Sequence, residues 1–314
     1  MATTLSAADT GRLNQALATW QQWSPAFSSA PQWQAKLGGL SNINILVTAA
    51  TAGTDRQAVV RLHNNNTHLG VNRHTERSIQ ACAAQAGIAP AWLYWQQEFS
   101  VVEYVTGAHF CPGQDHRQLA SIGHCIYAIH QLSPSQGGAP DAGPASALDP
   151  QQHLQHYWQM ALHAGATKPA GALHARRHRQ LRAEIEVRLA LALERQTPVW
   201  CHNDLSGANL LLNDQRLLVI DWEYSSPGQA LFDLAVCIHS NRLNKQQATT
   251  LLGAYAEGLA LQQVRPYLQV YAAIEALWFY LQNGNAAQLQ ARLTNRVLTN
   301  GSSELIDTSP ASMK

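Results

Sequence analysis

Residues 199–224 read VWCHNDLSGANLLLNDQRLLVIDWEY, and this stretch decides which fold the chain can adopt. Its first part places His202, Asp204 and Asn209 in the spacing HxDxxxxN. Two short apolar runs around turn-forming residues follow, which is the pattern of a hairpin. Asp221 comes directly after the second run. The hairpin would therefore return Asp221 to the neighbourhood of Asn209.

Oxygen-bearing side chains in this pattern suit the transfer of a phosphoryl group from ATP. That reaction needs a carboxylate to orient the hydroxyl nucleophile and oxygen ligands for Mg²⁺. Mg²⁺ prefers such hard donors, which Asn209 and Asp221 supply. Asp and Asn also occur in ordinary turns, so Asp221 at the end of an apolar strand favours the phosphotransfer interpretation. We interpret His202 as a structural histidine that braces the loop.

The composition limits the class of protein. The chain has 314 residues, of which 46% are hydrophobic, so it can form one large domain or two lobes around a sizeable core. Only 13% of residues are charged and the net charge is +1, which argues against nucleic acid or an anionic membrane as a partner. Five cysteines without a CxxC pair indicate reduced thiols, and residues 1–10 lack a signal-peptide pattern. We therefore expect a cytoplasmic protein, and the sequence predicts no oligomeric state.

The first third of the chain is expected to be rich in β-structure. Alternating apolar positions predict strands, and helical periodicity followed by Gly87 predicts a helix that ends there. The predicted strands lie in residues 38–50, 57–63, 92–95 and 99–105, and the predicted helices span residues 7–21 and 71–86. Residues 1–105 should therefore form a β-rich nucleotide-binding lobe.

The remainder is expected to be mainly helical. We predict helices over residues 115–132 and 151–196 and from residue 231 onward, with a Pro- and Gly-rich loop at 133–150. A hinge near residues 103–107 would separate the two lobes. Residues 106–314 should then form a helical lobe with the catalytic and metal loops and the acceptor pocket. The expected fold class is α+β.

The pattern HxDxxxxN followed by DWEY resembles the catalytic and metal loops of the aminoglycoside phosphotransferase, choline kinase and thiamine kinase superfamily. It is most similar to the choline and thiamine kinase branch. The resemblance implies a protein-kinase-like bilobal fold, with a small antiparallel sheet in the first lobe and a mainly helical second lobe. It also implies ATP and Mg²⁺ as cofactors, with Asp204 as the catalytic base and Asn209 and Asp221 on the metal. Asp233, in ALFDLA, would be a structural acid.

Kinases of this shape hold the phosphates of ATP with a cation on a strand, paired to an acid on the next helix. Arg61 is the available cation in a strand context, between Val60 and Leu62. Choline kinase-like families resemble this chain in using Arg there. Glu76 is the expected partner of Arg61, and together they would bind the nucleotide. A surface arginine beside an exposed glutamate is the structural alternative.

Two further segments are candidates for nucleotide contacts. Ser41 and Asn42 follow a glycine pair and could cover the phosphates, although an ordinary hairpin turn fits the same residues. FSVVEYVTG resembles the family's hinge, whose backbone holds adenine. Glu103 and Val105 in that segment are therefore expected to bind the cofactor.

The acceptor is expected to be a small cationic molecule. Trp222 and Glu223 follow the metal aspartate, and Glu275 and Trp278 share a helix face at i, i+3. Aromatic faces with a carboxylate suit a cation such as thiamine or choline, although the aromatics also fit an ordinary core. An aminoglycoside or sugar-hydroxyl phosphotransferase is the alternative enzyme. A non-catalytic nucleotide-binding pseudokinase is the alternative from another class.

Overall fold

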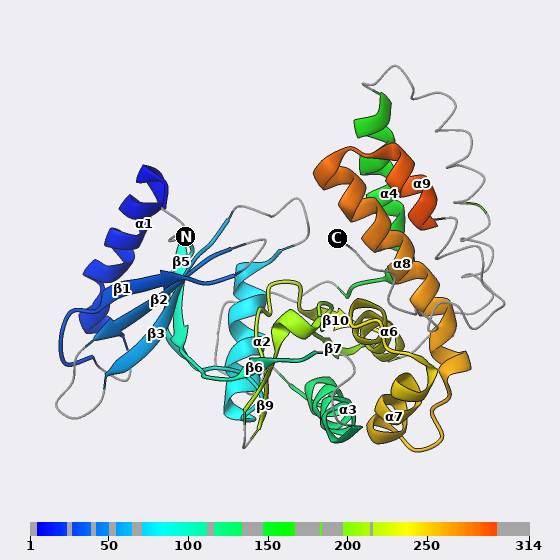
Figure 1. The fold of residues 1–314 in the computed structure, drawn as a ribbon, viewed down its shortest axis with the longest axis horizontal. Coiled ribbons are helices and arrows are strands. Elements are labelled where there is room, and N and C mark those ends of the chain that lie inside the picture. The colour runs from blue at the N-terminus through cyan, green and yellow to red at the C-terminus, as the bar shows by residue number, and fades with distance from the viewer. Residues whose placement is uncertain are drawn as a thin grey trace. The chain divides into compact units, whose positions relative to one another are not determined.

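Figure 1 shows the computed structural model, which describes residues 5–23, 27–38, 42–49, 55–64, 71–111, 116–133, 147–166, 183, 197–213 and 216–293. The chain divides into two compact units. The first comprises Met1–Ala108, Ser133–Gly143 and Leu211–Tyr224, and the second comprises His109–Leu132, Pro144–Leu210 and Ser225–Lys314. The first unit thus extends slightly past the predicted lobe boundary. It also includes Leu211–Tyr224, the hairpin region that the sequence assigned to the second lobe.

The first unit is built on a five-stranded antiparallel sheet of order β1-β2-β3-β5-β4. Four of its strands lie where the sequence predicted them, and β1 was missed. The strands are β1 (Gln32–Lys36), β2 (Ile43–Ala49), β3 (Arg56–Leu62), β4 (Trp92–Trp95) and β5 (Phe99–Glu103). The predicted β-rich first lobe is confirmed in its architecture.

One face of this sheet carries the core of the first unit. The N-terminal helix α1 (Ala7–Ala18) contributes Leu13 and Ala16 to it, together with alternate residues of the strands. Trp23, which follows the short η1 (Trp20–Gln22), belongs to the same core. Val60 and Leu62 of β3 belong to this core. Because successive side chains of a strand point to opposite faces, Arg61 lies on the other face of the sheet.

Helix α2 (Arg73–Gln85) follows the prediction closely. Its N-terminus is capped by Asn72, whose side chain accepts hydrogen bonds from the amides of His74 and Thr75. After the helix, Gly87 has φ of 75°, a left-handed conformation that glycine adopts without strain. The predicted stop at Gly87 is therefore confirmed.

The predicted hairpin is formed by β8 (Leu210–Leu212) and β9 (Leu217–Val219). The amide of Val219 donates a 2.8 Å hydrogen bond to the carbonyl of Ile88, just beyond α2. This contact fixes the end of β9 within the first unit. Asp221 therefore lies two residues after a strand end whose position is fixed.

The second unit is mainly helical, as predicted. Figure 1 shows α8, the longest described helix, passing α4, α6 and α9, and α3 lying beside α7. A two-stranded antiparallel pair of β10 and β7 sets Ser226 opposite Cys201. The elements are β6 (Ala108–His109), where the chain leaves the first unit, and then α3 (His116–His130), α4 (Pro150–Ala166), β7 (Val199–Cys201), η4 (Gly207–Asn209), β10 (Ser226–Gly228), α6 (Ala230–Ser240), α7 (Lys245–Tyr255), α8 (Leu261–Asn283) and α9 (Ala286–Leu293). Most of the loop predicted at 133–150 and of the helix predicted beyond residue 166 lies outside the described residues.

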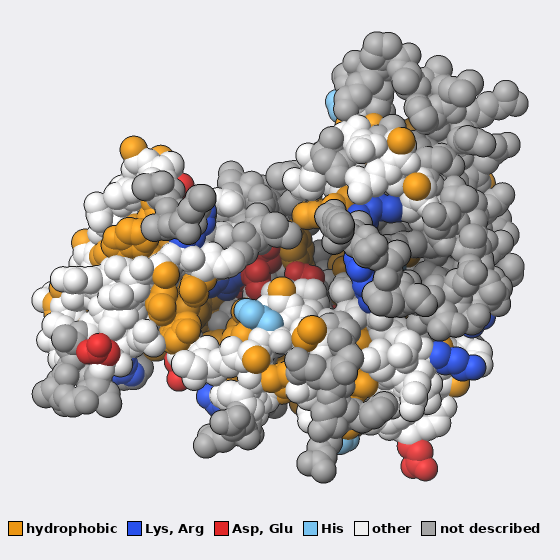
Figure 2. Space-filling view, in the orientation of Figure 1, with side chains coloured by type: hydrophobic (Ala, Val, Ile, Leu, Met, Phe, Trp, Pro, Cys, Tyr) orange, Lys and Arg blue, Asp and Glu red, His pale blue; other side chains and the backbone are white. Residues whose placement is uncertain are grey.

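The described surface agrees with the composition. On the face drawn in Figure 2, Lys and Arg side chains are scattered among uncharged ones. All five cysteines are free thiols, as expected, and only Cys111 is exposed. Each helix in the described part of the chain is too short or too polar to cross a lipid bilayer.

Candidate active site

The loop after β7 presents Asp204 together with Asn209. The side-chain amide of Asn209 donates to both the backbone carbonyl and the carboxylate Oδ2 of Asp204, each at 2.8 Å. Asn209 is buried and Asp204 is half-buried. The two hydrogen bonds fix the Asp204 side chain relative to its own backbone, so the carboxylate is oriented before any ligand arrives.

The loop conformation depends on local features of the sequence. A Cβ atom on Gly207 would lie 2.4 Å from the carbonyl oxygen of Phe110, so only glycine fits without a shift. The buried side chain of Asn241 donates a 2.9 Å hydrogen bond to the carbonyl of Leu205. The amide of Asp204 donates to Nδ1 of His202, which is fully buried. The structural interpretation of His202 is thereby supported.

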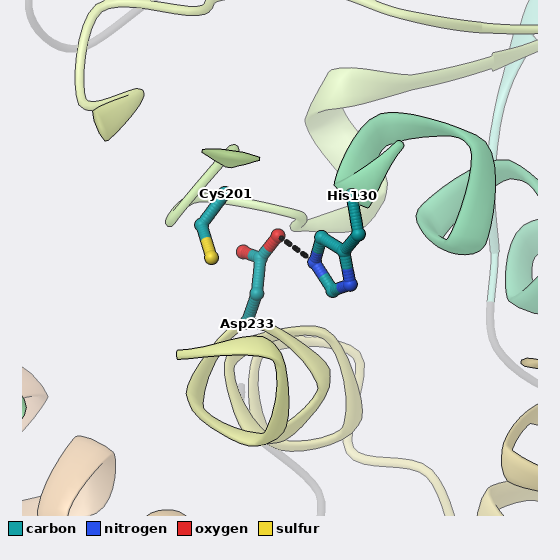
Figure 3. Close-up of side chains that lie close together, drawn as sticks. All are labelled: His130, Cys201 and Asp233. Atoms are coloured by element: carbon teal, nitrogen blue, oxygen red, sulfur yellow. Dashed lines mark hydrogen bonds and ion pairs between the residues drawn. The ribbon is translucent and has the colours of Figure 1, made fainter. Parts of the chain in front are cut away.

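Asp233 holds the start of this loop from α6. Its carboxylate accepts hydrogen bonds from the backbone amides of His202 (3.0 Å) and Asn203 (2.7 Å). It also accepts one from Nε2 of His130, at 3.1 Å, as Figure 3 shows. Burial acts to raise the pKa of Asp233, but the contacts with His130 and His202 outweigh it and the pKa is lowered. The side chain therefore remains a carboxylate, and its part as a structural acid follows from these contacts.

Substitution Asp233→Asn should lower the free energy of unfolding by about 3 kcal/mol, because a buried charge with several hydrogen bonds is lost. Urea unfolding followed by circular dichroism measures the change. Asp55→Asn, at an exposed position before β3, is the matched control and should change stability by less than about 0.5 kcal/mol. Equal stability of the two variants would contradict the bracing role of Asp233.

His130, Cys201 and Asp233 also form the one group of possible metal ligands that the described residues bring together, with their ligand atoms within 4.8 Å of one another. Figure 3 shows the three side chains facing each other. Both oxygens of Asp233 accept N–H donors, and Nδ1 of His130 lies 2.9 Å from the hydroxyl of Tyr255. The cluster is therefore a hydrogen-bonded brace, which leaves few lone pairs for an ion.

In the first unit, Arg61 is placed between two carboxylates. Its guanidinium donates to Glu76 at 2.9 Å and to Asp221 at 2.5 Å. Burial acts to raise the pKa of Glu76, but the charges of Arg61 and Arg73 prevail and lower it. The predicted Arg61–Glu76 ion pair is present, and the alternative of a surface arginine is wrong. Its contribution to nucleotide binding stays a prediction.

The sequence missed Arg73, which lies at the start of α2. Arg73 pairs with Glu76 at 2.7 Å and with Glu223 at 3.3 Å, and it donates to the side chain of Asn42 at 3.0 Å. Asn42 in turn donates a 2.9 Å hydrogen bond to Glu223. These residues are almost fully buried. Asn42 was expected to cover phosphates and Glu223 to face the acceptor, and the structure instead joins both side chains to Arg73.

Trp222 was expected to offer an aromatic face to the acceptor, and this prediction needs correction. The indole is fully buried, and its N–H donates a 2.9 Å hydrogen bond to the carbonyl of Val219. A ring in this position packs the core and closes the end of β9. The remaining nucleotide candidates are placed as follows: β5 ends at the exposed Glu103, Val105 is half-buried, and Ser41 lies outside the described residues.

Glu275 and Trp278 lie on α8, half-buried. Glu275 is within 3.3 Å of Nε2 of His239 and 3.5 Å of the guanidinium of Arg292 on α9. Tyr271, one turn earlier, was missed by sequence analysis. Burial raises the pKa of Tyr271, and the charge of Asp204 acts in the same direction.

The described donors fit a Mg²⁺ ion. The Asn209 amide nitrogen donates to Asp204, and among the described residues none donates to its side-chain carbonyl oxygen. Asp221 is a carboxylate in a left-handed conformation with φ of 64°. Burial and the charge of Glu76 raise the pKa of Asp221, although Arg61 opposes the shift. A divalent cation would compensate this half-buried negative charge, and a carboxylate or amide oxygen is a hard donor of the kind that Mg²⁺ prefers.

Two curated relatives align with parts of the chain. The protein LicA of Haemophilus influenzae is 51% identical over 55 residues, which are 18% of this chain and 21% of LicA. Thiamine kinase of Salmonella paratyphi A is 30% identical over 202 residues, which are 62% of this chain and 64% of that protein. The chain therefore spans less than two thirds of the length of either relative.

Solved structures of low sequence identity share the fold. Choline kinase LicA from Streptococcus pneumoniae superposes with a TM-score of 0.69 at 18% identity, covering 92% of this chain and 98% of that chain. LicA in complex with AMP gives a TM-score of 0.66 at 19% identity, covering 90% and 96%. The expected kinase-like α+β fold is thus confirmed. The model of the phosphotransferase enzyme family matches residues 32–274. The chain is accordingly a member of the phosphotransferase enzyme family.

Proposed function

We propose that this protein is an ATP- and Mg²⁺-dependent kinase that phosphorylates a hydroxyl of a small cationic metabolite of the thiamine or choline type. The observation that carries the proposal is the oriented Asp204 carboxylate, held by two 2.8 Å hydrogen bonds from Asn209. A fixed, half-buried carboxylate in this loop suits general base catalysis at an alcohol. Membership of the phosphotransferase enzyme family supports the same chemistry.

In the proposed reaction Asp204 accepts the proton of the acceptor hydroxyl. The hydroxyl oxygen forms a bond to the γ-phosphorus of ATP, and the bond between that phosphorus and the β–γ bridging oxygen breaks. The products are a phosphate monoester and ADP, and the proton remains on Asp204 until solvent removes it. The protein contributes mainly orientation and charge, which is how phosphoryl transfer is generally catalysed.

The phosphates and the adenine of the nucleotide are assigned to different groups of residues. Arg61, held by Glu76 at 2.9 Å, would bind phosphate oxygens, and the backbone around Glu103 and Val105 would hold adenine. Asn209 and Asp221 would bind Mg²⁺ through their side-chain oxygens. When bound, Mg²⁺ supplies positive charge that offsets the charge of the transferring phosphoryl group. The complex of LicA with AMP supports adenine-nucleotide binding by this fold.

The choice of a cationic acceptor is supported by the second unit and by the relatives. Tyr271, Glu275 and Trp278 lie on one helix, α8, and the charge of Asp204 adds to the raised pKa of Tyr271. Aromatic rings and a carboxylate attract quaternary ammonium and thiazolium groups. Thiamine is the first acceptor to test, because thiamine kinase is the relative aligned over the larger share of the chain.

The test is a transfer assay with γ-labelled ATP and a panel of thiamine, choline, ethanolamine and kanamycin, with Mg²⁺ or with EDTA. We expect labelled product from thiamine or choline, only in the presence of Mg²⁺. Transfer to kanamycin alone would replace the proposal with an antibiotic phosphotransferase. Binding of Mg²⁺–ATP without transfer to any panel member would favour a non-catalytic nucleotide-binding protein.

A further inference from the structure

Arg73 is the centre of a buried polar cluster in the first unit. Its side chain is 11% exposed and contacts Glu76 at 2.7 Å and Glu223 at 3.3 Å. It also donates to the side chain of Asn42 at 3.0 Å and to the carbonyl of Asn64 at 3.3 Å. These four acceptors come from α2 itself, the segment after β9, the residue before β2 and the segment after β3. One guanidinium thus joins four segments of the unit.

The cluster continues to the proposed metal ligand. Glu76 uses one carboxylate oxygen for Arg73 and the other for Arg61. Arg61 donates in turn to Asp221, at 2.5 Å. Without Arg73, Glu76 would be free to rotate toward Arg61. The direction of the Arg61 guanidinium therefore depends on Arg73 through Glu76.

The segment that carries Asp221 is held on both sides of that residue. A non-glycine residue with φ of 64° costs about 1 kcal/mol and persists only where its neighbours are fixed. Before it, the amide of Val219 fixes the end of β9 through its hydrogen bond to Ile88. The indole N–H of Trp222 donates to the carbonyl of Val219, which closes the turn that contains Asp221. After it, Glu223 is fixed by Arg73 and Asn42. The sequence Asp-Trp-Glu thus provides a ligand and two anchors.

The second anchor, Glu223, depends on the positive charge of Arg73. Glu223 is 1% exposed, and a buried carboxylate needs a paired cation to stay ionised. Three carboxylates, those of Glu76, Glu223 and Asp221, share the guanidiniums of Arg61 and Arg73. Both carboxylates approach Nη1 of Arg73, while Nη2 donates to Asn42 and Asn64. The planar guanidinium fixes the directions of all four contacts, which the single nitrogen of an ammonium group does not.

We infer that Arg73 is a positioning residue, which through Glu223 and Glu76 fixes Asp221 in the orientation that binds Mg²⁺ with the nucleotide. The inference rests on the proposed function in its assignment of Asp221 to the metal, but it concerns binding and not turnover. The inference distinguishes the two substrates. The Mg²⁺-dependent affinity for the nucleotide should depend on Arg73, whereas the affinity for the acceptor should not.

The test compares Arg73→Gln with wild type by isothermal titration with the non-hydrolysable analogue AMP-PNP, in Mg²⁺ and in EDTA. Loss of a residue that orients a metal ligand costs about 10- to 100-fold in metal affinity. We therefore expect AMP-PNP to bind about 10-fold more weakly in Mg²⁺, with little change in EDTA. Glu223→Gln should act in the same direction. The double variant should lose less than the two single losses multiplied, because the residues act together.

Arg77→Gln is the matched control. Arg77 lies one turn further along α2, is exposed, and stacks on the ring of Trp95 at 4.8 Å. Within the described residues it forms no ion pair with the carboxylates of the cluster. The Arg77→Gln substitution removes the same charge from the same helix, and it should leave the affinity for AMP-PNP unchanged. Arg73→Lys keeps the charge but not the fork, so we expect only partial recovery relative to Arg73→Gln.

Outcomes for this inference and for the proposed function can be separated. If wild type binds AMP-PNP in a Mg²⁺-dependent manner but transfers no phosphate, the proposed function fails while the Arg73 comparison still decides the inference. Equal Mg²⁺-dependent affinity of Arg73→Gln and wild type would overturn the inference. A uniform loss of affinity in Mg²⁺ and EDTA would also overturn it, because that is the signature of a merely structural residue. Absence of Mg²⁺-dependent binding by wild type would overturn both proposals.

Discussion

Asp204→Asn should reduce kcat for phosphoryl transfer about 1,000-fold while changing the KM for ATP by less than about 3-fold. The amide has nearly the same shape as the carboxylate but cannot accept the hydroxyl proton. The loop should survive the change, because Asn209 donates to the backbone carbonyl of residue 204 as well as to its side chain. Rates measured with saturating acceptor and varied Mg²⁺–ATP provide both parameters.

The effect on kcat has to be distinguished from loss of folded protein. Thermal unfolding of Asp204→Asn should match wild type closely, since Gly207, Asn241 and Asp233 hold the loop independently of the carboxylate. Asp55→Asn supplies an exposed control with the same change of side chain. Activity of Asp204→Asn within about 10-fold of wild type would remove Asp204 from the role of base.

The parts of the fold that were predictable are those in which hydrophobic periodicity and end signals agree. Helix α2 has a capping Asn72 and a left-handed Gly87, and both are local signals. The β8–β9 hairpin was likewise predictable from two apolar runs around turn residues. Strand β1 was not, because all five of its residues are exposed and its sequence QWQAK has no apolar alternation. It forms by backbone pairing with β2 at the sheet edge.

The site was predictable where spacing within one loop determines geometry. Asp204 and Asn209 are five residues apart and contact each other directly. The residues around Asp221 come instead from segments that are far apart in the sequence. Arg73 and Glu223 are 150 residues apart, and sequence offers no reason to prefer Arg73 over Arg77 on the same helix. The partners of Glu223 were not foreseeable, so the sequence assigned it to the acceptor from its position next to Asp221 and Trp222, whereas the structure pairs it with Arg73.

Glu275 illustrates the same limit in the second unit. Its spacing from Trp278 on α8 was correctly foreseen, but its neighbours were not. His239 comes from α6 and Arg292 from α9, and both approach the Glu275 carboxylate. A carboxylate beside an arginine attracts a cationic ligand less strongly than an isolated one, because the charges offset each other. The contribution of Glu275 to acceptor binding therefore stays a prediction, which the acceptor panel tests.

Asp221→Asn should weaken Mg²⁺-dependent nucleotide binding about 100-fold and leave binding in EDTA nearly unchanged. Asn is the cleaner substitution at this position. The backbone at Asp221 has φ of 64°, a region that Asn tolerates and Ala does not, so Asn removes the charge without adding backbone strain. The measurement is a titration with AMP-PNP at fixed Mg²⁺, repeated in EDTA.

The contact between Asp221 and Arg61 gives this prediction a second, opposite component. Removing the carboxylate releases Arg61 from its 2.5 Å partner, leaving Glu76 as the acid that holds it. A guanidinium with one carboxylate fewer has more positive charge to offer to phosphate oxygens. Binding in EDTA should therefore be equal to wild type or slightly tighter, even as the Mg²⁺-dependent increment is lost. Parallel weakening in both conditions would show that Asp221 supports the fold of the nucleotide site and does not bind the metal.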